Sequence, residues 1–396
     1  MSAHESLLLP LASLRARQSA KWTVYEPDVL PAWIADMDFA LAPPVRAALA
    51  ARLAAEDLGY PMMYPRAGLD ALFARRMAER YGWRIEKSQV EFFSDVVQII
   101  HMALQTLIEP GDGVIIQTPI YPPFLQSVAE TGRRAVLCPL VQTADGYRID
   151  FDALAAACDA GTRMLLLCHP HNPTGRAFTR EELAGLATLV RRHQLIVLSD
   201  EIHADLMLDA RAHIPFATLG DDIAARTITL TSPSKAFNLA GLVLAVAVFG
   251  SPALREQFGR LTGHVRGGRS AFGISATAAA WEAGEPWLAA VLAQLRANRE
   301  TVSAFVRERW PAIRYTPPEA TYLAWLDCRA LALGEEPWRF FLREARVALS
   351  EGPSFGAEGE GFVRLNFATS PVILEEILTR MDRALATAGR SRPAAR

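Results

Sequence analysis

The sequence predicts an α/β fold, in which a mostly parallel sheet is wrapped by helices and is followed by a smaller α+β part. Apolar, strand-like runs recur through the first two thirds of the chain, with helical patterns between some of them. These runs cover 114–117, 135–137, 164–168, 196–199, 227–230 and 243–249. Past residue 285 the pattern changes to a long helix at 287–309, short strands at 322–326, 347–350 and 362–367, and a last helix at 372–386.

Composition supports a large core and excludes several classes of partner. The chain has 396 residues, of which 51% are hydrophobic, so it exceeds a single typical domain. A formal net charge of -2 argues against nucleic acid and membrane surfaces as partners. The longest apolar run, 242–249, is far below a membrane span, and the first 20 residues lack the basic start of a signal peptide.

The cysteines fit a reducing compartment. None of the four stands in a CxxC spacing or a metal-ligand pattern: Cys138, Cys158, Cys168 and Cys328. Cys138 and Cys168 fall in apolar runs, where a buried free thiol is the ordinary interpretation. We therefore expect a cytoplasmic protein without a metal site.

Two polar runs stand at the ends of predicted strands. Lys235 follows the strand at 227–230, and Asp200 follows the apolar stretch 195–198. Open α/β sheets bind their ligands at this edge. A lysine can form a Schiff base with the aldehyde of pyridoxal 5′-phosphate (PLP), and an aspartate can keep its pyridine nitrogen protonated. The alternatives are a solvated surface lysine and a helix start at the Asp-Glu pair.

The run at 169–175, His-Pro-His-Asn-Pro-Thr-Gly, strengthens the cofactor interpretation. It follows the strand at 164–168 and precedes Thr179 and Glu182, which have the spacing of a capping box that opens a helix. An Asn-Pro turn alone is ordinary loop chemistry. Three polar runs in order, each at a strand end, favour a PLP site over unrelated loops.

With these residues in place, the chain resembles the class I/II aminotransferases of the PLP fold-type I superfamily, from about Trp33 to about Arg383. Within that superfamily it resembles most the branch of cystathionine β-lyases and cysteine-S-conjugate β-lyases, often called MalY/PatB-like. The resemblance is carried by 33–39, 59–61, 119–124, 171–175, 200–203, 234–241 and 361–367. The branch assignment rests on 35–39, His203 and the absence of an arginine at position 243.

The resemblance implies a division of the chain. It places a large PLP-binding domain at 45–285 and a discontinuous small domain at 1–44 and 286–387. The segment 388–396, which is small, basic and contains proline, is expected to be a disordered tail. The resemblance also implies a homodimer with shared active sites.

The resemblance assigns roles around the cofactor. Lys235 would bind the aldehyde and remove the substrate Cα proton, Asp200 would pair with the pyridine nitrogen, and Asn172 would donate to O3′. Tyr121 would stack on the ring, although it could instead be a turn aromatic beside two prolines. Lys235, Asp200 and Tyr121 are the expected catalytic residues. His203 stands where aminotransferases commonly have a tyrosine, and it could donate to O3′ similarly.

The expected phosphate donors lie in three places. The amides of Val96 and Val97 open a predicted helix, where free N–H groups bind anions. Ser232 and Ser234 complete the set. Tyr60 is expected to reach the site from a neighbouring subunit and to bind the cofactor there.

Two residues near the phosphate depart from the superfamily. Asp95 replaces a common glycine, and we expect its carboxylate to cap its own helix. Val243 occupies the position, eight residues after the lysine, where many aminotransferases have a phosphate-binding arginine. The β-lyase branch also tends to lack this arginine.

Arg364 is the expected clamp for the substrate α-carboxylate, because a guanidinium binds a carboxylate bidentately. The alternative is an exposed strand residue between two apolar ones. Asn172, Ala35, Asp36 and Tyr64 are the other candidates for binding substrate. Trp33 is a weaker candidate that could belong to the core.

The favoured function is a PLP-dependent C–S β-lyase that cleaves cystathionine or a cysteine S-conjugate to a thiol, pyruvate and ammonia. The main alternative is an aminotransferase that uses the same residues. A catalytically idle protein that binds a partner is disfavoured by the intact set of Lys235, Asp200, Asn172 and Arg364. A nicotinamide enzyme is excluded because no G-x-G-x-x-G follows an early strand. The sequence does not name the substrate.

Overall fold

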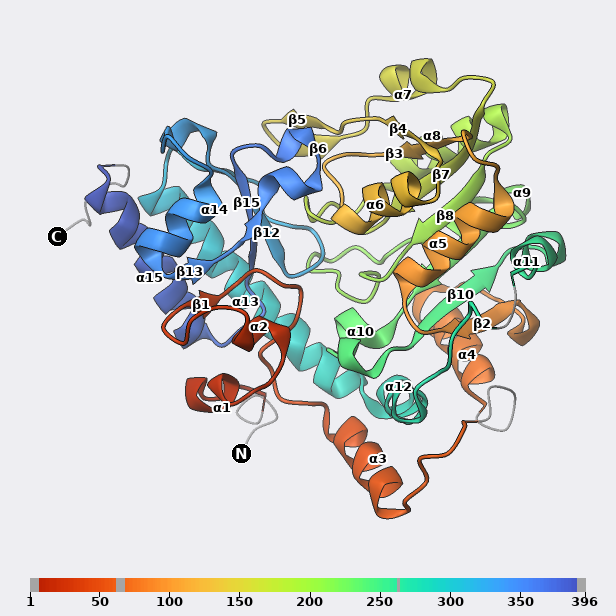
Figure 1. Cartoon of the computed structure of the whole chain (residues 1–396), viewed down its shortest axis with the longest axis horizontal. Helices are drawn as coiled ribbons and strands as arrows, with labels where there is room; N and C mark the ends of the chain where they lie inside the picture. The colour runs from red at the N-terminus through yellow and green to blue at the C-terminus, as the bar shows by residue number, and fades with distance from the viewer. Residues whose placement is uncertain (1–6, 62–67, 262–263, 390–396) are drawn as a thin grey trace.

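A seven-stranded sheet forms the centre of the structure (Figure 1). The computed structural model describes residues 7–61, 68–261 and 264–389. The strand order is β2 (Val90–Phe93), β10 (Ala245–Phe249), β9 (Thr227–Thr231), β8 (Ile196–Asp200), β7 (Thr162–Cys168), β3 (Gly113–Ile116) and β4 (Arg134–Leu137). β10 runs in the opposite direction to the other six strands of this sheet. The predicted α/β fold with a mostly parallel sheet is therefore confirmed.

Helices cover both faces of this sheet, which explains why its strands read as continuous apolar runs. On one face, Val114 and Ile116 pack with α5 (Val96–Leu107), α6 (Pro122–Glu130) and α11 (Pro252–Phe258). On the other, Ile115 packs with α7 (Phe151–Ala157) and α8 (Arg180–His193). Further along, α4 (Leu69–Tyr81) and α12 (Ala271–Ala283) cover β2 and β10.

A second, antiparallel sheet follows the long helix α13 (Glu285–Arg309). Its order is β11 (Arg314–Tyr315), β12 (Leu323–Asp327), β15 (Phe362–Asn366) and β14 (Ser350–Glu351). The last helix, α15 (Pro371–Thr387), packs against α13. The domain boundaries at 44/45 and 285/286 stay predictions.

Two predicted strands differ from the structure. The strand at 347–350 is two short ones, because β13 (Val347–Ala348) pairs with β1 (Leu30–Pro31) whereas β14 pairs with β15. The strand at 243–249 starts two residues later. Val243 has a left-handed φ of +46°, which ends the preceding turn and is incompatible with extended backbone.

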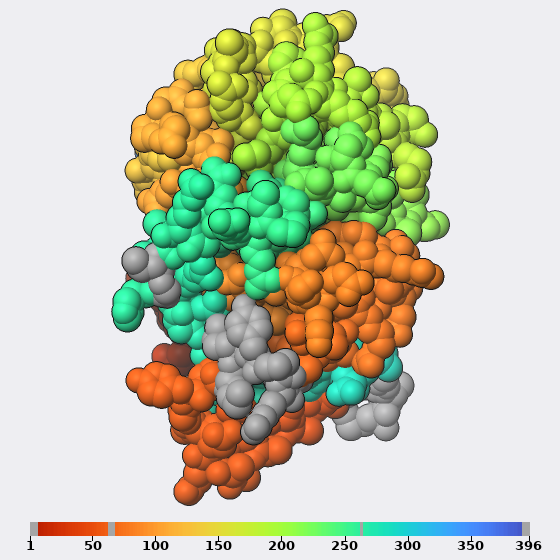
Figure 2. Space-filling model, turned by 90° about the vertical axis from the view of Figure 1, so that its right-hand side faces the viewer, coloured from red at the N-terminus to blue at the C-terminus, as the bar shows by residue number. Residues whose placement is uncertain are grey.

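The remaining elements are short. They are α1 (Leu11–Arg15), α2 (Ala20–Thr23), α3 (Pro43–Ala54), α9 (Asp221–Ala224), α10 (Pro233–Ala236), α14 (Pro337–Phe340), the hairpin β5 (Val141–Thr143) and β6 (Gly146–Arg148), and turns η1 (Lys87–Gln89), η2 (Phe216–Leu219), η3 (Ala240–Leu242), η4 (Arg329–Leu331), η5 (Phe341–Ala345), η6 (Gly352–Phe355) and η7 (Ala357–Gly359). Helix α3 projects from the lower end of the molecule, as Figure 2 shows. Within the described ranges, no helix is long and apolar enough to cross a membrane. Of the predicted tail, residues 390–396 lie outside the described residues.

Candidate active site

The carboxyl ends of β7, β8 and β9 open into a cavity of about 320 Å³. The described residues predicted from the sequence line it together, with the exceptions of Tyr60 and the weaker candidate Trp33. They are Lys235, Asp200, Tyr121, Asn172, His203, Val96, Val97, Ser232, Ser234, Arg364, Ala35 and Asp36. Side chains 329 positions apart in the chain, from Ala35 to Arg364, thus meet at one sheet edge.

Lys235 lies in the short helix α10, which begins as its sequence indicates, with a serine cap and a proline in the first turn. The Oγ atom of Ser232 accepts from the Ser234 amide at 3.0 Å and donates to the Leu244 carbonyl at 2.6 Å. The Lys235 Nζ donates to the Ala35 carbonyl at 3.1 Å. Burial lowers the pKa of the Lys235 ammonium, which makes its neutral, nucleophilic form easier to reach.

Asp200 is a buried carboxylate, and few interactions offset the cost of burying its charge. Its Oδ1 accepts one hydrogen bond, from the Ile202 amide at 3.0 Å, and the side chain forms no ion pair with any described residue. Burial raises the pKa of Asp200 to about 7, against the lowering effects of the Ile202 amide and of Lys235. A cationic N–H group in the cavity would restore the ionised form.

His203 is also buried, and its Nδ1 has no partner among the described residues. Burial, followed by the charges of Lys235 and Arg364, lowers the pKa of His203 to about 3. The imidazole is therefore neutral at physiological pH. A neutral ring has one N–H donor and one acceptor to offer to a ligand.

Arg364 is only 5% exposed, so the alternative of an exposed strand residue is wrong. Its Nη1 donates to Asn172 Oδ1 at 2.9 Å, and its Nη2 donates to the Trp33 carbonyl at 3.1 Å and to Ser350 Oγ at 3.0 Å. Because its oxygen is occupied by Arg364, Asn172 has its NH₂ group left for donation. Burial lowers the pKa of Arg364 to about 10, so it stays cationic at neutral pH.

At the opposite end of the cavity, α5 presents its first turn. The carboxylate of Asp95 accepts from the Gln98 amide at 2.8 Å, so the predicted cap is present. The amides of Val96 and Val97 belong to the first turn, whose N–H groups have no acceptor within the helix. Val243 contributes a half-exposed hydrocarbon side chain instead of a cation.

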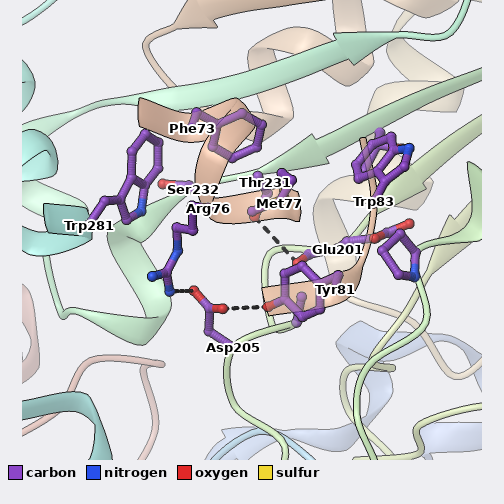
Figure 3. A pocket seen from close by; sticks show the side chains of 13 residues that line it. Phe73, Arg76, Met77, Tyr81, Trp83, Glu201, Asp205, Thr231, Ser232 and Trp281 are labelled. Atoms are coloured by element: carbon purple, nitrogen blue, oxygen red, sulfur yellow. Dashed lines mark hydrogen bonds and ion pairs between the residues drawn. The ribbon is translucent and has the colours of Figure 1, made fainter. Parts of the chain in front are cut away.

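The segment after β8 is fixed by a charged network, of which Figure 3 shows Arg76, Asp205 and Tyr81. Asp205 accepts from Arg76 Nη2 at 2.9 Å and from the Tyr81 hydroxyl, and it pairs with Arg80 Nε at 2.6 Å. Glu285 joins Arg76 and Arg80 from the start of α13. This network ties the segment that contains Asp200 and His203 to α4.

Several residues of the site were not predicted. The Tyr322 hydroxyl donates to the Ala35 carbonyl at 2.8 Å, next to Lys235, and Ser350 holds Arg364. Tyr322 stands in an apolar run, so the sequence gives no signal for it, whereas Ser350 begins a polar run at the end of the strand predicted at 347–350. Tyr60 is fully exposed and does not line the cavity of its own chain, whereas Tyr64 lies outside the described residues.

The cavity fits PLP in shape and charge. A lysine with a lowered pKa, a buried carboxylate without a cation, and free amides at a helix start match an aldehyde, a pyridinium and a phosphate. Within the described ranges, no group of three His, Cys, Asp or Glu side chains could hold a metal ion.

Comparison with known proteins identifies the family. The family model "Aminotransferase class I and II" matches residues 35–381. The chain belongs to that family. Cystathionine β-lyase PatB from Bacillus subtilis is 37% identical over 90% of this chain and 93% of its own. A putative cystathionine β-lyase from Mycobacterium leprae is 39% identical over 95% and 97%.

The structures and the more distant relatives agree with this assignment. Cystalysin from Treponema denticola, solved with PLP, superimposes with a TM-score of 0.90 at 31% identity, covering 94% of this chain and 97% of its own. Transaminases from Pseudomonas aeruginosa and Pyrococcus horikoshii are 28% and 26% identical. The family and the β-lyase branch that the sequence predicted are therefore confirmed.

Proposed function

We propose that this chain is a PLP-dependent C–S β-lyase, which cleaves cystathionine or a cysteine S-conjugate to a thiol, pyruvate and ammonia. The observation that carries the proposal is the joint placement of Lys235, Asp200 and Arg364 in one cavity of a chain 37–39% identical to cystathionine β-lyases. The relatives named as lyases are more similar than those named as transaminases.

Each wall of the cavity would hold one part of the cofactor. Lys235 would hold the aldehyde, Asp200 the ring nitrogen, and Asn172 with His203 the O3′ atom. Tyr121 would cover a face of the ring. The phosphate would lie against the amides of Val96 and Val97, with Ser232 and Ser234 nearby; the hydroxyl hydrogen of Ser232 is already donated to Leu244.

The protein's own part in the reaction follows from these positions. When bound, the cofactor would supply an electron sink for the electrons left at the substrate Cα. Arg364 would bind the α-carboxylate and orient the Cα–H bond toward Lys235. Lys235 would then take that proton, and its lowered pKa favours the neutral amine that can do so. Asp200, ionised once it faces a cation, would hold the ring nitrogen protonated.

Product analysis tests the reaction type. A cysteine thioether should release thiol, pyruvate and ammonia with no 2-oxo acid added, because the thiolate leaves from Cβ. Alanine has no leaving group and should at most convert the cofactor slowly to its amine form. Fast, 2-oxo-acid-dependent turnover of ordinary amino acids with negligible thiol release would establish the aminotransferase instead.

We propose that the active unit is a cytoplasmic homodimer in which Tyr60 reaches the partner's active site. In support, Tyr60 is fully exposed beside the exposed apolar residues Leu53 and Leu58. An unpartnered apolar stretch of this kind is typical of an interface. A monomeric mass of the active enzyme in sedimentation velocity would contradict this arrangement.

A further inference from the structure

A second cavity, of about 370 Å³, adjoins the candidate active site. It is lined by residues between 17 and 22, around the start of α2, and between 238 and 241, just after α10. Asp36 and Ala240 line both cavities. The two cavities therefore meet at these two residues.

The backbone around Asp36 is fixed from both sides. The Ala35 carbonyl faces Lys235 and Tyr322, and the Asp36 carbonyl accepts from Lys21 Nζ at 2.9 Å and Asn366 Nδ2 at 2.7 Å. These contacts fix the backbone at Asp36, and the residue lines both cavities.

The carboxylate of Asp36, in contrast, has no hydrogen bond or ion pair with any described residue. It is half-buried. Its neighbour Asp38 shows the opposite arrangement, since Lys21 Nζ and Trp22 Nε1 both reach its carboxylate at 2.8 Å. Of these two carboxylates, only Asp36 is available to a cation that comes with a ligand.

The second cavity also offers a cation. Arg17 lines it and donates only to carbonyls, those of Phe39 at 3.1 Å and Met37 at 3.4 Å. Carbonyls are neutral, so no described carboxylate neutralises the guanidinium, whereas the charge of Lys21 is neutralised by Asp38. A carboxylate at Asp36 and a guanidinium at Arg17 complement a ligand group that carries an ammonium and a carboxylate.

We propose that the second cavity receives the thiol portion of the substrate, and that Asp36 and Arg17 select thioethers whose thiol portion is itself an α-amino acid. Asp36 binds the distal ammonium and Arg17 the distal carboxylate. This selection rests on the proposed lyase function, and it favours the cystathionine type of substrate over apolar cysteine conjugates.

The test uses holoenzyme and three thioethers that differ in one terminal group: S-(2-aminoethyl)-, S-(2-carboxyethyl)- and S-propyl-L-cysteine. The readout is the ratio of kcat/KM between a charged thioether and S-propylcysteine, measured from thiol release. Such a ratio cancels any general effect of Asp36 on Lys235, which it influences through space. Asp36→Asn should lower the aminoethyl ratio about tenfold or more, as expected for one charge-assisted contact.

Arg17→Gln should lower the carboxyethyl ratio by a similar factor and leave the aminoethyl ratio unchanged. This second variant keeps the proposal testable if Asp36→Asn fails to fold. The matched control is Asp152→Asn, which removes the same charge from the exposed start of α7 and should change neither ratio. Binding is measured as well, from the cofactor absorbance. The affinity of Asp36→Asn for L-lysine should fall relative to its affinity for L-norleucine.

The outcomes separate the two proposals. Unchanged ratios in both variants, with thiol still released, would overturn the second cavity as a subsite and leave the lyase function standing. No thiol release from any thioether by the wild-type enzyme would overturn the lyase function, and this selection with it.

Discussion

Asp200 and Asp205 stand five residues apart on one segment, yet their surroundings are opposite. Asp205 has two arginines and a tyrosine hydroxyl around it, and these outweigh its burial, so the pKa of Asp205 lies below its usual value. Asp200 has one backbone amide, and burial raises its pKa to about 7. Side chains of the fold neutralise the charge of Asp205, which fixes the segment. Asp200, which faces the cavity, has no such ion pair with any described residue.

The same difference extends to the surrounding groups. Around Asp205, Arg76 is paired with both Asp205 and Glu285. Around Asp200, the Nδ1 of His203 and the Nε of Arg364 are buried without a partner in the described part of the chain. Both side chains line the cavity, where a ligand would supply the missing partners.

The largest expected effect is that of Asp200→Asn on activity. A neutral amide cannot hold the pyridine nitrogen protonated, so kcat/KM for a cysteine thioether should fall about 10³-fold. Asp205→Asn, the matched change on the same segment, should cost far less activity. Steady-state thiol release checks both variants, with cofactor content measured by absorbance. Equal losses in the two variants would mean that Asp200 acts only through the stability of the segment.

Arg364→Lys should have the next largest effect. Lysine keeps the charge but loses the two-pronged contact, so kcat/KM should fall about 10- to 100-fold while the cofactor stays bound. The control is Arg329→Lys, an exposed arginine that lies over the ring of Phe362 as Arg364 lies over the ring of Phe355. It should leave turnover unchanged. A parallel loss of cofactor affinity in Arg364→Lys would instead place Arg364 at the phosphate.

The cavity around Asp200 and the network around Asp205 were not equally predictable from the sequence. Lys235, Asp200 and Asn172 stand in polar runs at strand ends, so local pattern reveals them. Arg364 required the family resemblance, since an arginine between two apolar residues also suits an exposed strand.

Contacts between distant positions could not be predicted. Arg76 lies 129 positions before Asp205, and Tyr322 lies 287 positions after Ala35. Arg76 stands in an amphipathic helix, where its neighbours in the sequence do not indicate a partner. Tyr322 stands beside an apolar strand, which predicts only a core residue. The left-handed backbone at Val243 is equally hidden, because a β-branched residue after a turn predicts a strand.

The third expected effect concerns the stability of the cofactor-free protein, where the two carboxylates should act with opposite sign. In Asp205→Asn, Arg76 loses one of its two carboxylate partners. The free energy of unfolding at neutral pH should therefore fall by about 2–3 kcal/mol, less than for a pair broken completely. Asp200→Asn removes a buried charge that has no ion pair with any described residue. Unfolding of this variant at the same pH should therefore require more free energy than unfolding of the wild type.

The pH dependence distinguishes these contributions. The folded pKa of Asp200, about 7, lies above its unfolded value of about 3.9, so the folded state binds the extra proton between these pH values. The free energy of unfolding of the wild type, relative to that of Asp200→Asn, should therefore fall as pH rises from about 4 to 7. For Asp205 the folded pKa is the lower one, so its stabilisation is complete above about pH 4 and is lost as pH falls below that. Denaturant unfolding at a series of pH values measures both differences. The comparison between the two carboxylates would fail if Asp200→Asn were less stable than the wild type at pH 7.5, or if its advantage did not grow between pH 4.5 and 7.5.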